Sequence, residues 1–366
     1  MKGLILSITT GQGHNQTAKV MSDRFYESGI DCPYLDALKY INPILSESVQ
    51  NLYLMSSKTL PKIYGKIYNK VEDKNGNELK GIPKITNKLL AHRLIDMIHS
   101  ENPDFIICTH VFSALLITSI KKHINPNIIT LGIITDFTIH PYWEDTRIDY
   151  YITPTATLSS QGMRRGIPTD KLVPLGIPID RKFSTKTSQS DARKALNIKD
   201  KRTILVMSGS MGFGNIISEL KALDRTPLDF QILNVCGNNK KLKKKVDKLT
   251  LEKDIYNFGY VNNVDIMMDA ADCIITKPGG LTTSEALAKQ LPMIMSNPVP
   301  GHEDRNVEFL LNAGVAIKTS ATYPIEDAIN QLFTENRLSL IKEAILEVGK
   351  PNATNDLAEF IIKNVK

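Results

Sequence analysis

Short, mostly apolar runs of three to eight residues recur along the chain, separated by stretches long enough to form helices. After the first run, residues 2–9, the apolar residues 17–25 return at helical spacing. A continuous apolar run is typical of a strand that is covered on both faces, and strands that alternate with helices predict a parallel sheet wound by crossover helices. The pattern therefore predicts an α/β protein whose functional loops lie at the carboxyl ends of the strands.

The predicted strands fall into two groups. Four precede a break, at residues 2–9, 104–109, 128–135 and 150–153, and five follow it, at residues 203–208, 230–235, 255–258, 273–276 and 293–295. The break at residues 178–190 follows Pro174, starts with Pro178 and is rich in Ser, Thr and Lys, which is typical of a linker. We therefore expect an N-terminal domain at 1–180, a C-terminal domain at 181–350, and a helix within 351–366. Leu357, Phe360, Ile361 and Val365 share one face of that helix, which suits it for packing on the N-terminal domain.

Composition excludes several classes of protein. The 366 residues are enough for about two domains, and 42% apolar with 23% charged residues is typical of a globular chain. No run reaches the roughly 18 apolar residues of a membrane span, and the N-terminus becomes polar too early for a signal peptide. We therefore expect a cytoplasmic protein. Its four cysteines are too widely spaced for a metal or redox motif and are expected to be buried: Cys32, Cys108, Cys236 and Cys273.

The formal net charge of +6 is concentrated in residues 58–93, where nine Lys or Arg face three Asp or Glu. The rest of the chain is neutral overall, which disfavours a nucleic-acid binder and indicates one local anionic partner. On a helical wheel the lysines of this segment lie opposite an apolar face that includes two tyrosines. These residues are Lys58, Lys62, Lys66, Lys70, Tyr64 and Tyr68. The helix either packs on the core with a solvated lysine stripe or binds an anionic membrane surface.

The first candidate site is the turn TTGQGHNQTAK, residues 9–19. Gly11 and Gly13 let the backbone approach a ligand, and the helix N-terminus that follows favours an anion. Nicotinamide binding is disfavoured, because Gln16 replaces the third glycine of the usual pattern and no acidic residue closes a clear second strand. His14 is either a proton acceptor or a structural histidine at the helix start.

The second candidate is GIITDFTIHPYW, residues 132–143, in which Asp136 follows a predicted buried strand. A carboxylate at the carboxyl end of a strand can orient a histidine or accept a proton. The alternative is that Asp136 caps a turn.

The third candidate is ITKPGGLTTSEALAKQLPMI, residues 275–294. Thr282 and Thr283 are predicted to cap a helix whose first backbone N–H groups bind an anion. Glu285 can accept two hydrogen bonds from a ribose diol, or instead pair with Thr282 in a capping box. The segment MSGSMGFGN, residues 207–215, repeats the arrangement of a strand followed by a glycine loop.

These motifs in this order resemble glycosyltransferase family 28. The set comprises G-x-G-H after the first strand, TDFxxHxxW, LGIPID, the second-domain glycine loop, TKPGGxTxxEAL and NPVPGHEDRN, and it covers nearly the whole chain. Within that family the chain is most similar to the diacylglycerol glucosyltransferases and monogalactosyldiacylglycerol synthases. The resemblance implies a GT-B fold, with two Rossmann-like domains facing across a cleft. The acceptor site would lie in the N-terminal domain and the UDP-sugar site in the C-terminal domain.

The resemblance also implies roles for individual residues. His14 or Asp136 would be the catalytic base. Glu285 would bind the uridine ribose, and Phe258 and Tyr260 would hold the uracil. The remaining donor-binding residues would be Ser208, Gly209, Ser210, Gly279, Gly280, Leu281, Thr282 and Thr283 near the diphosphate, and His302, Glu303 and Asn306 near the sugar.

The implied activity is the inverting transfer of glucose or galactose from a UDP-sugar to the 3-hydroxyl of 1,2-diacylglycerol. It would need no metal or other cofactor and would take place at the inner face of the cell membrane, with no nucleic-acid partner. Three alternatives are an N-acetylglucosamine transferase that acts on an undecaprenyl-linked peptidoglycan precursor, a UDP-sugar epimerase, and a catalytically silent lipid- or nucleotide-binding protein.

Overall fold

The computed structural model describes residues 1–9, 12–44, 46, 47, 88–207, 209, 212 and 214–365, without the side chains of residues 88–91 and 302. The predictions for Gly11, Ser208, Ser210, Lys58, Lys62, Lys66, Lys70, Tyr64 and Tyr68 lie outside these residues. The chain divides into two compact units. The first consists of Met1–Asp180, Pro300–His302 and Asn352–Lys366, and the second of Arg181–Val299 and Glu303–Pro351.

The first unit is built on a six-stranded parallel sheet in the order β2-β1-β3-β4-β5-β6. Its strands are β1 (Gly3–Ser7), β2 (Tyr34–Asp36), β3 (Phe105–Cys108), β4 (Ile129–Ile133), β5 (Tyr150–Ile152) and β6 (Leu172–Val173). Its helices are α1 (Gly13–Glu27), α2 (Ala37–Ile41), α5 (Lys88–Glu101), α6 (Val111–Ile120), α7 (Ser159–Arg164) and α16 (Ala353–Asn364). Single 3-10 turns are η1 (Lys121–His123), η2 (Pro141–Asp145), η3 (Ala156–Leu158) and η4 (Thr169–Lys171). Every residue of β1 and β3 is buried, as expected for apolar strands in the middle of a parallel sheet.

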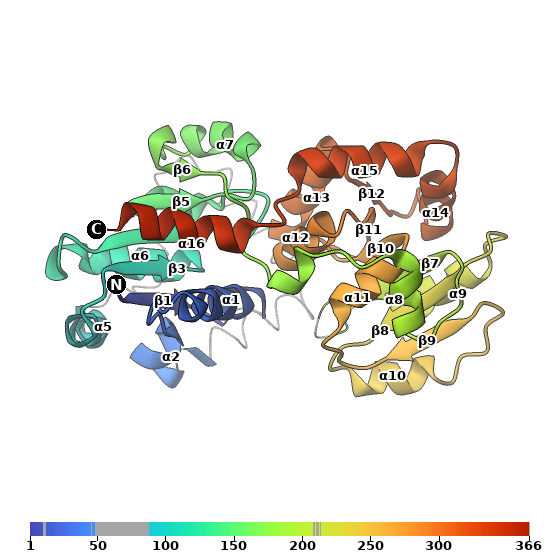
Figure 1. The fold of residues 1–366 in the computed structure, drawn as a ribbon, viewed down its shortest axis with the longest axis horizontal. Coiled ribbons are helices and arrows are strands. Elements are labelled where there is room, and N and C mark those ends of the chain that lie inside the picture. Colours follow the sequence, from blue (N-terminus) through green and yellow to red (C-terminus); the bar gives the residue numbers. More distant parts are fainter. Residues whose placement is uncertain are drawn as a thin grey trace. The chain divides into compact units, whose positions relative to one another are not determined.

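The last helix of the chain completes the core of this first unit. Helix α16 packs beside α1, as the red and dark blue helices of Figure 1 show. Leu357 and Ile361 join Met21 and Phe25 of α1 in one buried cluster, and the ring of Phe360 meets Tyr150 edge-on. Residues from the two ends of the sequence therefore stabilise the same apolar core.

The second unit repeats the architecture, with a parallel sheet in the order β12-β11-β10-β7-β8-β9. Its strands are β7 (Thr203–Met207), β8 (Gln231–Val235), β9 (Ile255–Phe258), β10 (Cys273–Thr276), β11 (Met293–Met295) and β12 (Ala316–Lys318). Its helical segments are η5 (Arg181–Phe183), α8 (Gln189–Ala195), α9 (Ile216–Asp224), α10 (Lys240–Val246), α11 (Val264–Ala270), α12 (Gly280–Ala288), α13 (His302–Asn312), α14 (Ile325–Phe333) and α15 (Arg337–Val348).

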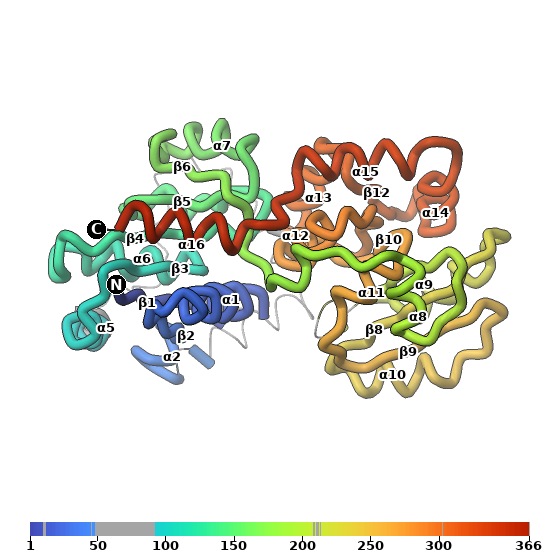
Figure 2. The backbone as a smooth tube through the Cα atoms, in the orientation of Figure 1, coloured from blue at the N-terminus to red at the C-terminus, as the bar shows by residue number. Residues whose placement is uncertain are grey.

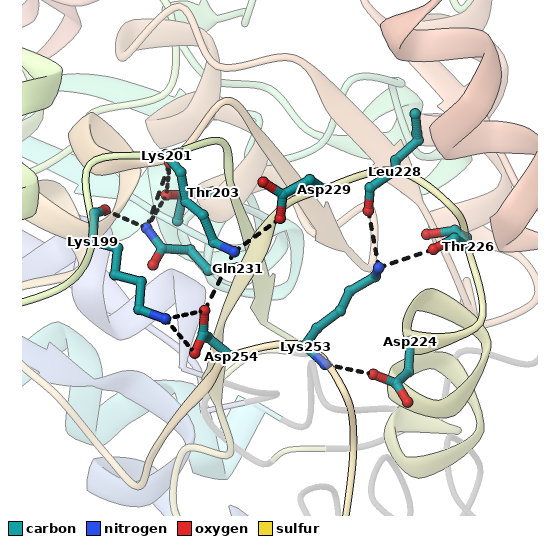
Figure 3. Close-up of polar contacts among 10 residues, drawn as sticks. All are labelled: Lys199, Lys201, Thr203, Asp224, Thr226, Leu228, Asp229, Gln231, Lys253 and Asp254. Atoms are coloured by element: carbon teal, nitrogen blue, oxygen red, sulfur yellow. Dashed lines mark hydrogen bonds and ion pairs between the residues drawn. The ribbon is translucent and has the colours of Figure 1, made fainter.

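Polar side chains clamp the amino ends of β7, β8 and β9 (Figure 3). Gln231 donates to the Lys199 carbonyl at 2.6 Å and to the Thr203 hydroxyl at 2.8 Å. Lys253 donates to two backbone carbonyls in the segment before β8, and Asp254 accepts from Lys199. These contacts lie at the amino ends of the strands, whereas the glycine loops follow the carboxyl ends. Their role is therefore to hold the strands together.

The predicted α/β class and its parallel sheets are confirmed. All nine predicted strands are present, with ends that differ from the prediction by a few residues at most. Three further strands, β2, β6 and β12, were not predicted; each has only two or three residues, too few to stand out from the surrounding sequence. The four cysteines are buried and free. Among the described helices, none has the length and apolarity needed to cross a membrane.

Candidate active site

Two groups of side chains collect at the carboxyl edges of the sheets, one in each unit. In the first unit, His14 lies in the first turn of α1. Its Nδ1 is 2.8 Å from the carbonyl oxygen of Thr109, which follows β3, and 3.2 Å from the Thr135 hydroxyl, which follows β4. Because a carbonyl oxygen only accepts, Nδ1 carries the proton and donates it. In the neutral ring, Nε2 is then the nitrogen that carries a lone pair and can accept a proton.

His110 lies against His14 and was missed by the sequence analysis. The two rings meet edge to face, with centroids 4.6 Å apart. His110 Nδ1 accepts the Phe112 N–H at 3.1 Å and thereby caps α6. Burial, reinforced by the nearby His14 and His140, holds the pKa of His110 well below its usual value. His110 is therefore a neutral neighbour of His14 that carries its own proton on Nε2.

His140 and Asp136 lie at the same edge, in the loop that follows β4. His140 Nδ1 accepts the Tyr142 N–H at 3.1 Å, so its neutral ring is protonated at Nε2, like that of His110. Asp136 is half-buried, three residues beyond the end of β4. Of the three histidines His14, His110 and His140, only His14 donates from Nδ1 to a carbonyl and so keeps Nε2 as a proton acceptor.

The expectation that no acidic residue closes a second strand is wrong. Strand β2 ends in Asp36, whose carboxylate accepts from the Thr9 N–H at 2.9 Å, from the Thr9 hydroxyl at 2.5 Å and from the Lys39 N–H at 2.9 Å. Asn15 adds a bond to Thr9 at 2.8 Å. Because Asp36 is used in holding the turn before α1, it is not presented to a ribose. Nicotinamide binding is therefore still disfavoured, but because Asp36 is engaged by the turn before α1 and not because an acidic residue is missing.

In the second unit, the turn after β10 leads directly into α12. The expectation that Thr282 and Thr283 cap this helix is wrong, because the helix begins at Gly280 and its N-cap is Gly279. The first helical bond runs from the Thr283 N–H to the Gly279 carbonyl at 3.0 Å. The N–H groups of residues 280–282 precede that bond and are directed out of the end of the helix, an arrangement that attracts an anion. Glu285, half-buried, follows one turn later, so it is not the capping-box partner of Thr282.

Two buried residues of α13 brace this turn. Glu303 is only 2% exposed and accepts from the Lys277 ammonium at 2.8 Å and from the Val299 N–H at 2.7 Å. Asn306 is fully buried and donates to the Pro278 carbonyl at 2.9 Å. Both side chains therefore position the backbone that precedes Gly279. Glu303 also holds the ammonium of Lys277 at this edge.

The glycine loop after β7 lies next to this turn because β7 and β10 are neighbours in the sheet. Gly209, Gly212 and Gly214 all have positive φ, a conformation that side chains other than glycine rarely adopt. A Cβ on Gly209 would lie 3.2 Å from Lys277 Cε, and one on Gly212 would lie 2.3 Å from a backbone carbonyl of the β8–α10 turn. The positive φ disfavours a side chain at all three positions, and at Gly212 the close backbone approach excludes one as well.

Glu219, in the first turn of α9, ties a third loop to this edge. It accepts from the Ser296 hydroxyl and, at 2.6 Å, from the Asn297 amide, both of which follow β11. Burial raises the pKa of Glu219, while the two hydrogen bonds act in the opposite direction. Phe258 and Tyr260, at the carboxyl end of the edge strand β9, complete the set of predicted residues, and Tyr260 is 63% exposed.

Comparison with known proteins identifies the family. A family model described as monogalactosyldiacylglycerol (MGDG) synthase matches residues 14–179, and one described as glycosyl transferases group 1 matches residues 188–346. A processive diacylglycerol beta-glucosyltransferase of Bacillus cereus is 30% identical, spanning 99% of this chain and 93% of that protein. The corresponding protein of Bacillus cytotoxicus is 29% identical, with the same coverage. The chain belongs to this glycosyltransferase family.

The fold of this glycosyltransferase agrees with that assignment. The solved structure of Acinetobacter baumannii MurG aligns over 99% of both chains with a TM-score of 0.64 and 16% identity. The predicted GT-B architecture of two Rossmann-like units is therefore confirmed, as is the predicted resemblance to the diacylglycerol glucosyltransferases.

Four residues of the glycosyltransferase that contact the site were not predicted: Asp36, His110, Glu219 and Lys277. A weak signal was present for two of them. His110 directly follows the predicted strand at residues 104–109, and Lys277 lies inside the third motif. Asp36 and Glu219 act through hydrogen bonds to loops far away in the sequence, which no local pattern reveals.

Proposed function

We propose that this glycosyltransferase moves glucose from UDP-glucose to the 3-hydroxyl of 1,2-diacylglycerol, with inversion at the anomeric carbon. The hydrogen bond from His14 Nδ1 to the Thr109 carbonyl carries the proposal, because it leaves Nε2 as a proton acceptor. The names of the relatives support glucose and diacylglycerol as substrates. Galactose is the alternative donor sugar. A β-linked product formed from an α-linked sugar nucleotide requires one direct displacement.

In that displacement the acceptor oxygen forms a bond to the anomeric carbon while the bond from this carbon to UDP breaks. The hydroxyl proton passes to His14 Nε2 and then to solvent, and UDP leaves with the bonding electron pair. The neutral His110 beside His14 adds no positive charge that would oppose protonation. Asp136 is the second candidate for the base, at the same edge of the sheet.

The donor is proposed to bind the second unit. The N–H groups at the start of α12 and the Lys277 ammonium would stabilise the negative charge that develops on the departing UDP. Glu285 would bind the ribose hydroxyls, and Phe258 with Tyr260 would hold the uracil. The glycine loop at 208–211 would approach the diphosphate through its backbone. Glu303 and Asn306 would act by positioning the Lys277–Gly279 turn, with His302 nearer the sugar.

Two further parts of the proposal concern the setting of the reaction. Charge stabilisation by helix N-termini and Lys277 supplies what a metal ion provides in other transferases, so we propose that no resident metal takes part. The acceptor is a membrane lipid, so we propose that the protein acts peripherally at the inner face of the cell membrane. Lys58, Lys62, Lys66 and Lys70, with Tyr64 and Tyr68, would bind the anionic surface there.

The test incubates the full chain with UDP-glucose or UDP-galactose and vesicles that contain or lack diacylglycerol. We expect UDP release to depend on diacylglycerol and to be faster with UDP-glucose, and a mass spectrum of the lipid to show an added hexose. An epimerised sugar nucleotide without lipid product would support an epimerase instead. Transfer only from UDP-N-acetylglucosamine to an undecaprenyl-linked acceptor would support the peptidoglycan alternative.

A further inference from the structure

Helix α10 and the turn that follows it carry a dense run of positive charge. Residues 240–248 contain six Lys and one Asp. At about 100° per residue, four lysines of α10 fall within an arc of roughly 140°, opposite the buried Val246, and Lys248 follows in the turn. All five are exposed, and we call them the lysine face: Lys240, Lys241, Lys244, Lys245 and Lys248.

The one acidic residue of the segment does not neutralise this face. Asp247 accepts from the Asn257 amide at 2.7 Å and pairs with Lys243 at 3.0 Å, away from the five exposed lysines. These contacts, the Asn257 bond foremost, hold the pKa of Asp247 below its usual value. Across the part of the chain that the structure describes, no ion pair involves a lysine of the lysine face. The face therefore presents five positive charges to its surroundings.

The lysine face is firmly connected to the proposed donor site. Asn239 caps α10 by accepting the Leu242 N–H at 2.9 Å, and its amide donates to the Gly212 carbonyl of the glycine loop at 3.1 Å. Further along α10, Asn257 of β9 donates to the Lys243 carbonyl at 3.1 Å. Figure 2 shows α10 in yellow beside β9, at the margin of the second unit. A surface that binds α10 would therefore hold the glycine loop close to it.

We propose that the lysine face docks the second unit on an anionic membrane surface. Flexible lysines spread over one helix face suit the diffuse negative charge of lipid headgroups, whereas base readout in a nucleic acid relies on arginine, amide and aromatic contacts. The choice of a membrane rests on the proposed function, in which the acceptor is a bilayer lipid. Docking at α10 would keep the glycine loop after β7, which is proposed to bind UDP-glucose, close to the membrane surface where diacylglycerol is found. The lysine face also adds a second basic cluster to the one at residues 58–93, which the total of +6 does not reveal.

The test measures partition of the full chain onto phosphatidylcholine vesicles with and without phosphatidylglycerol, at low and high salt. The variant Lys241→Gln plus Lys245→Gln is expected to lower partition onto the anionic vesicles about 30-fold at low salt. The effect should shrink as salt screens the charges. Partition onto pure phosphatidylcholine is expected to stay the same. The basic segment at residues 58–93 is identical in every variant and contributes equally.

Two matched controls accompany this variant. Lys241→Arg plus Lys245→Arg keeps the charge at both positions and is expected to bind like the parent. Lys342→Gln plus Lys350→Gln removes the same charge from exposed positions in and after α15 and is also expected to bind like the parent. Both Gln pairs alter exposed side chains only, and circular dichroism checks that they fold.

Unchanged partition of the Lys241→Gln plus Lys245→Gln variant would overturn the proposal. So would a loss confined to binding of a tRNA probe, which would assign the face to nucleic acid. The outcome is separable from the proposed function, because vesicle binding needs no turnover. If the Lys241→Gln plus Lys245→Gln variant loses partition as expected but the parent never transfers glucose, only the proposed function is refuted. If the parent transfers glucose normally but the variant partitions like the parent, only the role of the lysine face is refuted.

Discussion

Among His14, His110 and His140, His14 is the one whose Nδ1 donates to a carbonyl, and replacing it by alanine removes the Nε2 atom proposed as the base. We expect kcat/KM for transfer to fall by roughly 10²- to 10⁴-fold, which corresponds to about 3–5 kcal/mol of activation free energy. The Thr109 carbonyl that sets the tautomer belongs to the backbone and stays in every variant. The second contact of Nδ1, at 3.2 Å, is with the side-chain hydroxyl of Thr135, which a substitution can remove.

A graded series follows from these two contacts. Thr135→Val removes one contact worth about 0.5–1.5 kcal/mol, so the rate should fall by roughly 2- to 10-fold, far less than in His14→Ala. Initial rates of UDP release are measured with diacylglycerol vesicles across pH. A rate that depends on neutral His14 should fall once Nε2 is protonated, and this fall should be absent in His14→Ala.

The binding of UDP serves as the control, because the donor site is proposed to lie on the other unit. Calorimetric affinity for UDP should be the same in the parent and in both variants. A folded His14→Ala enzyme with near-normal turnover would remove His14 from the mechanism and leave Asp136 as the base. A Thr135→Val enzyme as impaired as His14→Ala would refute the argument from the tautomer.

Three other substitutions test the second unit. Glu285→Ala should raise KM for UDP-glucose by on the order of 10²-fold or more, because two hydrogen bonds to a carboxylate contribute about 1.5–3 kcal/mol each. Gly279→Ala should leave the free energy of unfolding within about 0.5 kcal/mol, since its φ is −75° and no atom lies within 4 Å of the added Cβ. It should nonetheless raise KM for UDP-glucose about tenfold by crowding the diphosphate. Glu219→Gln keeps the accepting oxygen but cannot ionise, so its stability relative to the parent should increase as pH rises through the raised pKa of Glu219.

Each of these expectations has a result that contradicts it. An unchanged KM in the Glu285→Ala enzyme would exclude ribose binding by this residue. Gly279→Ala with lower stability and normal KM would make the turn structural only. For Glu219, the folded carboxyl binds its proton more tightly than the unfolded one, so its ionisation costs stability above the ordinary pKa. Stability is measured by urea unfolding across pH. If the Glu219→Gln variant loses stability relative to the parent as pH rises, the raised pKa of Glu219 is contradicted.

The sequence predicted most of the fold because buried parallel strands are continuous apolar runs. β3 and β4 are of this kind. The strands it missed are short, and β2 starts with a tyrosine that is 44% exposed, so its sequence has no apolar signature. Their place in the sheet comes from pairing with β1, β5 and β11, which is a property of the assembled sheet.

The candidate site was predicted only in part, for a related reason. His14 and Glu285 belong to motifs with local spacing. His110 reaches His14 only because β1 and β3 are neighbours in the sheet, and the sequence does not specify that order. The start of α12 was placed too late because the threonines are good capping residues, whereas Gly279 reaches the extended N-cap conformation without a side chain.

Helix α16 has a consequence for how the polypeptide becomes folded during translation. The core around Phe25 lacks Leu357, Ala358 and Ile361 until the ribosome has made residues 353–365, some 330 positions later in the chain. The second unit draws on residues 181–351 and can close earlier. The N-terminal unit is thus begun first and finished last. A premature stop that deletes α16 alone would leave an open apolar groove along α1, a surface that chaperones and proteases recognise.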